Sequence, residues 1–251
     1  MNASLAVQAE LDTASVLRIV AGRYGGTNRF TRHYIDAKLR GDPVHAAVLA
    51  LGRARRLGTV LDVGCGRGQL ALALLVAGVA DHVTGLDRDA GALHAARTAA
   101  GGLPFLAVAH DLAAGMDGTL PPVDCVLAVD VLYQLDTGAQ HRLLAGAMLA
   151  AREMVVLRTL DPDRGLRSRI GVGLERLALR RWPHSGSLVN PRPVAELCGV
   201  LAQGGFKVEV TPCWAGTPLA NVLVVARRTP GRGCQHGSFS QDCPNSENTR
   251  R

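Results

Sequence analysis

Residues 59–70, with the sequence TVLDVGCGRGQL, decide the fold of this chain. The first five residues favour a buried β-strand, and the Leu- and Ala-rich run from Gln69 to Ala77 favours a helix that packs on a sheet. Three glycines separate these elements, so the chain can turn sharply and a ligand can approach the backbone and the helix N-terminus. The pattern predicts a nucleoside site between a strand and a helix.

The glycine spacing distinguishes two kinds of nucleotide site. A dinucleotide-binding turn has the pattern G-x-G-x-x-G, but Gln69 stands where its third glycine should fall. Asp62 lies at the end of the strand, where its carboxylate would repel a pyrophosphate and attract the ammonium of a nucleoside that carries an amino acid. Together with Gly64, Gly66 and Gly68, Asp62 argues against NAD and for an amino-acid-bearing nucleoside.

At these residues the sequence resembles motif I of the class I S-adenosylmethionine (SAM)-dependent methyltransferases, and the similarity runs from about Asp42 to Arg228. The resemblance implies an α/β, Rossmann-like class I methyltransferase fold. Its seven-stranded, mostly parallel sheet would carry an antiparallel closing strand and helices on both faces. It also implies SAM as cofactor, without a metal. The alternative is an ordinary glycine turn in an α/β domain.

Carboxylates follow the next two predicted strands. Residues 81–87 end in Asp87, which lies 23 residues after Gly64, and at this spacing the second strand of a βαβ unit can offer an acid to ribose hydroxyls. Residues 105–109 form a third strand, followed by Asp111 and Leu112. We expect Asp111 to accept a hydrogen bond from the adenine amine and Leu112 to lie against the ring. Either acid alone could cap a turn, but acids at the ends of successive strands favour a ligand-binding role.

Residues 123–135 are nearly all apolar, as in a central parallel strand that is buried on both faces. Open α/β sheets bind ligands at the carboxyl ends of their strands, so we expect Asp130 and Tyr133 at the site. Both are candidate catalytic residues, and Asp130 is also a candidate cofactor contact. The stretch resembles motif IV of many small-molecule methyltransferases and lacks the N/D-P-P-Y/F sequence of many amino-group nucleic-acid methyltransferases.

A base for an acceptor hydroxyl has no distinctive sequence context. Histidine titrates near neutral pH, so His33, His110 and His141 are possible bases, and His33 is the third candidate catalytic residue. A lone histidine is more often an ordinary surface or core residue.

The remaining chain divides into three parts. Residues 1–57 are predicted to form an N-terminal helical cap, in which Asp42 caps a helix that begins at Pro43. Residues 58–228 are the predicted SAM-binding domain. Residues 229–251 contain one large apolar residue, so we expect a disordered tail.

Regular alternation of strands and helices stops after a predicted fifth strand at residues 153–158. Residues 160–192 contain a basic amphipathic segment, and the resemblance implies that this insertion covers the substrate pocket. The alternative is a packed helix with a solvated basic side. The apolar residues that share one face of the segment are Leu166, Ile170, Leu174 and Leu177.

Composition limits the possible partners. The 251 residues are 47% hydrophobic, enough for one large core, and contain no apolar run of membrane-spanning length. Six cysteines without a C-x-x-C pair predict reduced thiols and a cytoplasmic location. The net charge of +7 suits nucleic acid, but only two of the 28 basic residues are lysines and aromatic content is 4%, which leaves few platforms for stacking bases.

The leading hypothesis is a SAM-dependent methyltransferase that acts on a small or lipid-like metabolite, free or on an acidic carrier protein. Arginines before residue 57 and after the fifth strand would meet a carboxylate, a phosphate or the carrier. Two alternatives remain, an RNA methyltransferase that uses the basic surface and a non-catalytic SAM-fold binding protein.

Overall fold

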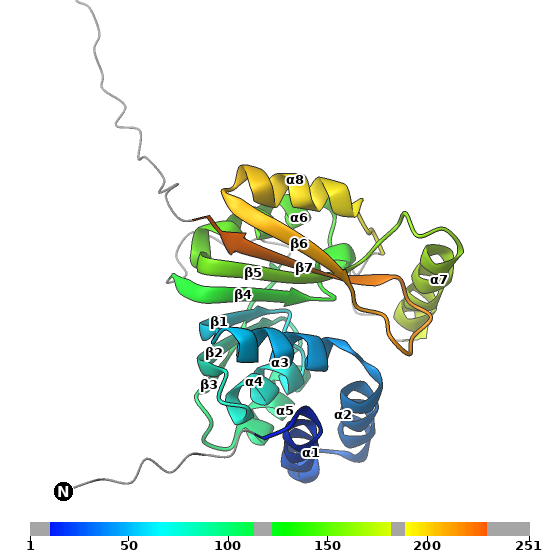
Figure 1. Ribbon diagram of the computed structural model, residues 1–251. Coiled ribbons are helices and arrows are strands. Elements are labelled where there is room, and N and C mark those ends of the chain that lie inside the picture. The colour runs from blue at the N-terminus through cyan, green and yellow to red at the C-terminus, as the bar shows by residue number, and fades with distance from the viewer. Residues whose placement is uncertain (1–10, 113–121, 182–188, 230–251) are drawn as a thin grey trace, which may run out of the picture.

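The computed structural model describes residues 11–112, 122–181 and 189–229. In these ranges seven strands form one sheet in the order β3-β2-β1-β4-β5-β7-β6 (Figure 1). Strands β1 to β5 run parallel, and β7 runs antiparallel to both β5 and β6. The strands are β1 (Gly58–Val63), β2 (Ala80–Asp87), β3 (Phe105–Ala109), β4 (Val123–Val129), β5 (Ala151–Leu160), β6 (Phe206–Pro212) and β7 (Asn221–Arg228). The predicted Rossmann-like α/β sheet is confirmed.

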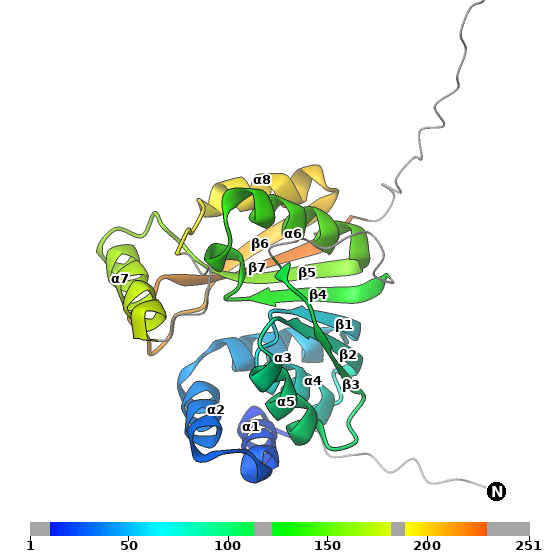
Figure 2. The same cartoon turned by 180° about the vertical axis from the view of Figure 1, so that it is seen from behind.

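Helices cover both faces of the sheet (Figures 1 and 2). Helices α1, α3 and α4 contribute to one hydrophobic core, and α6 and α8 contribute to the other. Successive side chains of β1 point to opposite faces of the sheet. Val60 belongs to the first core and Leu61 to the second. The helices are α1 (Thr13–Arg23), α2 (Arg29–Gly41), α3 (Val44–Ala54), α4 (Gln69–Val76), α5 (Ala90–Ala100), α6 (Thr137–Ala150), α7 (Leu166–Arg181) and α8 (Val194–Gln203), with short 3-10 turns η1 (Tyr24–Gly26) and η3 (Leu132–Gln134).

The first helices are tied to the sheet by polar as well as apolar contacts. Val16 and Val20 of α1 are fully buried in the first core. The guanidinium of Arg23 donates hydrogen bonds to the carbonyl oxygens of Ala99 and Ala100, at 2.8 and 2.5 Å. The hydroxyl of Tyr24 donates to the carbonyl of Arg67 in the glycine turn, at 2.6 Å. The segment before β1 therefore helps to hold the turn in place.

Two predicted boundaries were wrong. The strand expected over residues 123–135 ends at Val129, because Asp130 has a φ of +59° and leads into η3. The helix expected to begin at Pro43 begins at Val44. Asp42 still accepts a hydrogen bond from the Val44 amide, but the same carboxylate also binds Arg158 on β5. Tertiary contacts thus shifted both boundaries.

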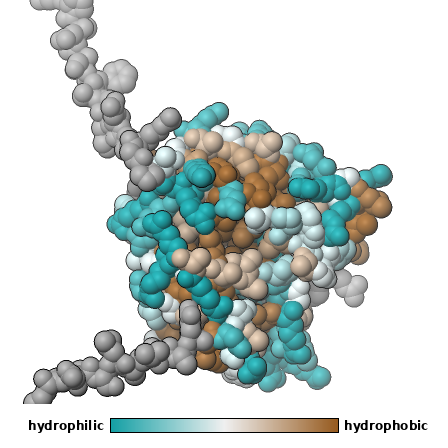
Figure 3. Space-filling view, viewed as in Figure 1, coloured by the Kyte–Doolittle hydropathy of each residue, from teal (hydrophilic) through white to brown (hydrophobic). Residues whose placement is uncertain are grey.

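The apolar stripe of α7 faces outward. Of its side chains, Leu166 is 71% exposed, Ile170 42%, Leu174 43% and Leu177 60%. Figure 3 shows apolar side chains gathered over α7 at the right of the view. The alternative of a packed helix with a solvated basic side agrees with the exposure of Arg169 and Arg176, but the apolar stripe is exposed as well. None of the helices in the described ranges is long and apolar enough to span a membrane.

Two predictions concern residues without a described structure. The expected disordered tail lies outside the described residues from position 230 onward, and so do Cys234 and Cys243. The other four cysteines are free thiols.

A buried guanidinium on β5 joins the sheet to the N-terminal helices. Arg158 is 1% exposed and forms ion pairs with both Asp42, between α2 and α3, and Asp130, after β4. Its Nη2 lies 2.8 Å from Asp42 Oδ2, and its Nε lies 2.8 Å from Asp130 Oδ1. Burial alone would raise the pKa of Asp42, but hydrogen bonds and charge from Arg158 hold it below its usual range.

We expect Arg158→Met to lower the free energy of unfolding by about 3–5 kcal/mol, because it leaves the Asp130 carboxylate without its ion-pair partner and Asp42 with Lys38 alone. Arg152→Met on the same strand removes an exposed pair with Asp124 and should cost at most about 1 kcal/mol. Urea unfolding followed by circular dichroism measures both. Because the pKa of Asp42 is depressed, the stabilisation should be present at neutral pH and decline as the pH falls below about 4. Equal losses of unfolding free energy in the two variants would contradict the stabilising role of the buried Arg158 ion pairs.

Candidate active site

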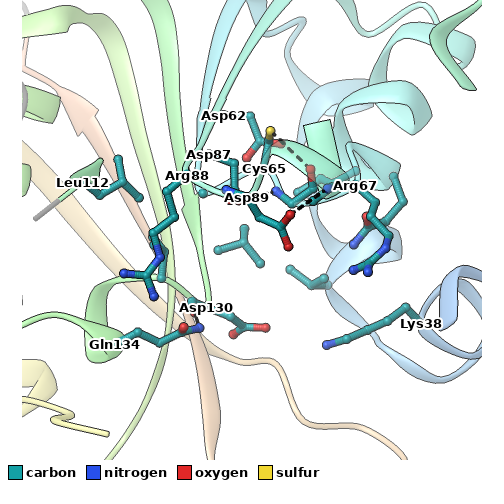
Figure 4. A pocket seen from close by; sticks show the side chains of 18 of the residues that line it. Lys38, Asp62, Cys65, Arg67, Asp87, Arg88, Asp89, Leu112, Asp130 and Gln134 are labelled. Atoms are coloured by element: carbon teal, nitrogen blue, oxygen red, sulfur yellow. Dashed lines mark hydrogen bonds between the residues drawn. The ribbon is translucent and has the colours of Figure 1, made fainter. Parts of the chain in front are cut away.

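A cavity of about 970 Å³ lies at the carboxyl ends of β1, β2 and β4. Figure 4 shows Asp62 and Asp87 on one side of it and Lys38, Asp130 and Gln134 on the other. The first side is built by the glycine turn and the ends of β1 and β2, and the second by α2, η3 and α7. The cavity therefore joins the predicted nucleoside site to a region that the N-terminal helices and α7 enclose.

The glycine turn has the backbone conformation that its sequence predicts. Gly64, Gly66 and Gly68 all have positive φ, at 74°, 54° and 77°. A Cβ built at Gly64 would lie 2.8 Å from Val131 Cγ2, so a side chain there would collide with the segment after β4. A Cβ at Gly66 would meet nothing within 4 Å, and Gly66 lines the cavity. The turn thus leaves open space for a ligand against its backbone.

Asp62 is a buried carboxylate with unused hydrogen-bonding capacity. It lines the cavity, and within the described residues its Oδ2 atom has no hydrogen-bond partner. Burial, and secondly the charge of Asp87, raise the pKa of Asp62 to about 7. A buried acceptor in this state is suited to a cationic donor from a ligand.

The acid at the end of β2 is held in a fixed orientation. Asp87 accepts hydrogen bonds from the amides of Gly66 and Asp89, at 2.8 and 2.9 Å. One oxygen is thereby fixed to the glycine turn and the other to the start of α5. Asp111 and Leu112, after β3, also line the cavity. Of the expected cofactor contacts, Gly68 does not line the cavity. The others do, and they are Asp62, Gly64, Gly66, Asp87, Asp111, Leu112 and Asp130.

Asp130 lines the cavity in a conformation that few non-glycine residues adopt. Its φ of +59° is stabilised by tertiary contacts, since Arg158 binds its carboxylate and Gln134 Nε2 lies 2.5 Å from its carbonyl oxygen. Because the guanidinium already engages the carboxylate, Asp130 is suited to fixing the shape and charge of the cavity rather than to accepting a proton.

Tyr133 and Glu175 are neighbours in the second half of the cavity. Burial, then the nearby charge of Asp130, raise the pKa of Tyr133 well above its usual value, so its hydroxyl remains a donor. Burial, then Asp130, also raise the pKa of Glu175, while the charge of Lys38 lowers it. Glu175 is thus a carboxyl group with raised basicity that lines the cavity.

None of the three histidines considered as bases, all of which lie in the described ranges, lines the cavity. His33 is exposed on α2, where its Nε2 lies 3.3 Å from Arg29 Nε, and it borders a separate depression beside Arg32 and Asp36. A different histidine, His45 on α3, is buried and lines the cavity. Burial lowers the pKa of His45, so its imidazole is favoured in the neutral form.

Sequence reasoning also missed Lys38 and Glu175. Lys38 lines the cavity from α2, with its Nζ 3.3 Å from Asp42 Oδ2. Glu175 is the only acidic residue between Asp163 and Glu196, in a segment rich in arginine, and this isolation was the one available signal. Within the described residues no group of three or more His, Cys, Asp or Glu side chains is arranged to hold a metal ion.

Comparison with known proteins agrees with this geometry. Residues 60–152 match the family model described as a methyltransferase domain. No curated protein sequence gives a significant match. Many solved structures share the fold, and three of them illustrate the similarity.

The S-adenosylmethionine-dependent methyltransferase SibL, in its apo form, is 26% identical, with 90% of this chain and 71% of that chain covered and a TM-score of 0.59. The magnesium protoporphyrin IX methyltransferase of Synechocystis PCC 6803, with bound S-adenosylhomocysteine (SAH), is 18% identical, with 86% and 96% covered and a TM-score of 0.58. The pyocyanin biosynthetic protein PhzM is 24% identical, with 87% and 62% covered and a TM-score of 0.57.

The same magnesium protoporphyrin IX methyltransferase has also been solved with bound SAM. The match over residues 60–152 shows that the chain contains a methyltransferase domain, and its strand order and the cavity at the strand ends resemble those of the class I SAM-dependent methyltransferases.

Proposed function

We propose that this enzyme methylates a small or lipid-like metabolite, free or presented by a carrier, which binds between α2 and α7. The observation that carries the proposal is the continuity of the cavity from Asp62 to Glu175. Its volume of about 970 Å³ is at the upper end of the range of about 300–1,000 Å³ for small-molecule sites, which suits a nucleoside and a small acceptor together. Two structural neighbours named for magnesium protoporphyrin IX and pyocyanin support a small-molecule acceptor.

In this proposal, SAM supplies an activated methyl group on a sulfonium. The orphaned oxygen of Asp62 orients the ammonium of the amino-acid end. Asp87, already fixed by two backbone amides, binds the ribose hydroxyls. Asp111 and Leu112 hold the adenine, and the open space at Gly66 admits the nucleoside to the backbone. The reacting end would then point toward Asp130.

The second half of the cavity offers a proton acceptor for a hydroxyl nucleophile. Glu175 replaces His33 as our candidate base, because it lines the cavity and its pKa is raised, whereas His33 borders a different depression. We infer that the hydroxyl of Tyr133, which lies beside Glu175, donates a hydrogen bond that orients the carboxylate. Much of the rate would come from alignment of the nucleophile with the methyl group.

The direct test is incubation with methyl-labelled SAM and fractionated cell extract, followed by identification of the labelled product. We expect label in a small or organic-soluble compound, or in one released from a carrier protein. Label found only in RNA would contradict the proposed acceptor. Binding of SAM with no transfer to any fraction would instead favour a non-catalytic role.

We expect Asp87→Ala to weaken SAM binding about 10- to 100-fold, because ribose hydroxyls would lose a charged hydrogen-bond acceptor. Isothermal titration calorimetry measures the affinity. Asp81→Ala at the other end of β2 removes only a surface pair with Arg56 and is the matched control. Unchanged affinity in Asp87→Ala would contradict the ribose assignment.

The raised pKa of Asp62 predicts a pH-dependent affinity. Below pH 7 the ligand-free enzyme holds a proton on Asp62, and this proton must leave before the carboxylate can pair with an ammonium. SAM affinity should therefore rise as the pH increases toward about 7 and level off above it. Calorimetry across this range, in buffers of different ionisation enthalpy, would also detect the released proton. Asp62→Asn should remove this dependence, and an identical slope in both proteins would refute the assignment.

Once the acceptor is known, and if it is a hydroxyl, Glu175→Gln should lower kcat about 10²- to 10⁴-fold and leave SAM affinity unchanged. Tyr133→Phe should have a smaller effect, because it removes only the hydrogen bond that orients the carboxylate. Single-turnover rates with labelled SAM measure both. A rate for Glu175→Gln within twofold of the wild type would exclude Glu175 as the base.

A further inference from the structure

The exposed apolar stripe of α7 is not used by the proposed methyl transfer. Its members, spaced by four, four and three residues, form a continuous line along the helix. Scattered exposed leucines are normal on soluble proteins, but a contiguous apolar line marks a surface that contacts something else. Figure 3 shows an apolar patch over α7, and the exposed large apolar side chains of the described part of this helix are those of the stripe.

Contacts on the opposite side of α7 fix the stripe in its outward orientation. Ser168 is buried, and its hydroxyl donates to the carbonyl of Asp161 at 2.6 Å. Gly171 is packed closely, since a Cβ there would lie 3.3 Å from Leu160 Cδ2. Glu175, on the same side, lines the cavity. The helix therefore cannot turn its stripe inward without breaking these contacts and withdrawing Glu175.

The arginines around the stripe favour binding to a negatively charged surface. Arg169 and Arg176 are exposed beside it, and within α7 the one acidic residue, Glu175, is turned toward the cavity. On the other flank, Arg167 donates to the carbonyls of Thr217 and Leu219. A helix with an apolar line, flanking arginines and no exposed acid has the pattern of helices that lie in the interface of an anionic membrane.

Helix α2 adds similar groups around the same cavity. Tyr34 lines the cavity and, with Phe30, is exposed. The guanidinium of Arg67 lies 4.7 Å from the Tyr34 ring centre and 5.8 Å from that of Phe30. Exposed Arg29 and Arg32 belong to the same helix. Apolar and basic groups thus occur on both helices that enclose the acceptor half of the cavity.

We propose that α7 docks on an anionic lipid surface, with its apolar stripe at the level of the acyl chains and Arg169 and Arg176 at the phosphates. This binding is independent of methyl transfer, and it would bring the acceptor half of the cavity close to the membrane. A second copy of the chain fits less well, because pairing two such faces would bring arginines close to arginines. An acidic protein partner would pair with the arginines, but the apolar line of side chains does not require a protein partner.

The test is co-sedimentation of the full-length enzyme with vesicles of phosphatidylcholine, with and without phosphatidylglycerol. We expect binding only to the anionic vesicles, weakened by salt. The double variant Ile170→Ser and Leu174→Ser should reduce it at least about tenfold, since both side chains lose their apolar contact. Leu149→Ser on α6, where the leucine is 72% exposed, is the matched control and should bind like the wild type.

The charge contribution has its own controls. Arg169→Gln and Arg176→Gln should each weaken binding to anionic vesicles about fivefold, and Arg152→Gln, at the start of β5, should not. SAM affinity measured by calorimetry should be unchanged in all these variants, which separates loss of docking from loss of the nucleoside site or of the fold. Absence of wild-type binding to anionic vesicles would overturn the proposal. So would a self-associated enzyme, seen by light scattering, that the Ile170 and Leu174 double variant converts to monomers.

Discussion

The second half of the cavity, between α2 and α7, depends on the buried guanidinium of Arg158. It compensates two carboxylates from distant parts of the chain, Asp42 and Asp130, at the edge of the cavity. Without it, burial and mutual repulsion would favour separation of these acids. The same contact stabilises the left-handed backbone at Asp130 and, through Asp42, the end of α2 that carries Lys38. One side chain on β5 thus positions groups from three elements.

The half of the cavity at the ends of β1 and β2 is held by contacts of a different kind. Its residues belong to a continuous β1–turn–α4–β2 unit, in which positive-φ glycines keep the backbone open and the amide of Gly66 fixes Asp87. These contacts are local or between adjacent strands, so they require no help from α7. The proposed cofactor half of the cavity is therefore encoded mainly by one continuous segment, and the proposed acceptor half is assembled from contacts between distant segments.

This division explains what the sequence could predict. Strand and helix periodicity together with the family resemblance predicted the sheet. Parallel strand ends converge, so Asp62, Asp87 and Asp111, which were expected at those ends, line one cavity. Periodicity does not say which face of a helix meets the protein, so it missed that Glu175 faces inward and the α7 stripe outward. It could not place His45 or exclude His33, because their surroundings come from tertiary packing.

In the proposed mechanism, one cavity holds SAM at the ends of β1, β2 and β3 and the acceptor between α2 and α7. A crystal structure of the protein with SAH would show whether it does. We predict the amino-acid end at Asp62, the ribose at Asp87, the adenine at Asp111 and Leu112, and the sulfur facing Asp130. A nucleoside bound elsewhere, or with its adenine between α2 and α7, would contradict this mechanism.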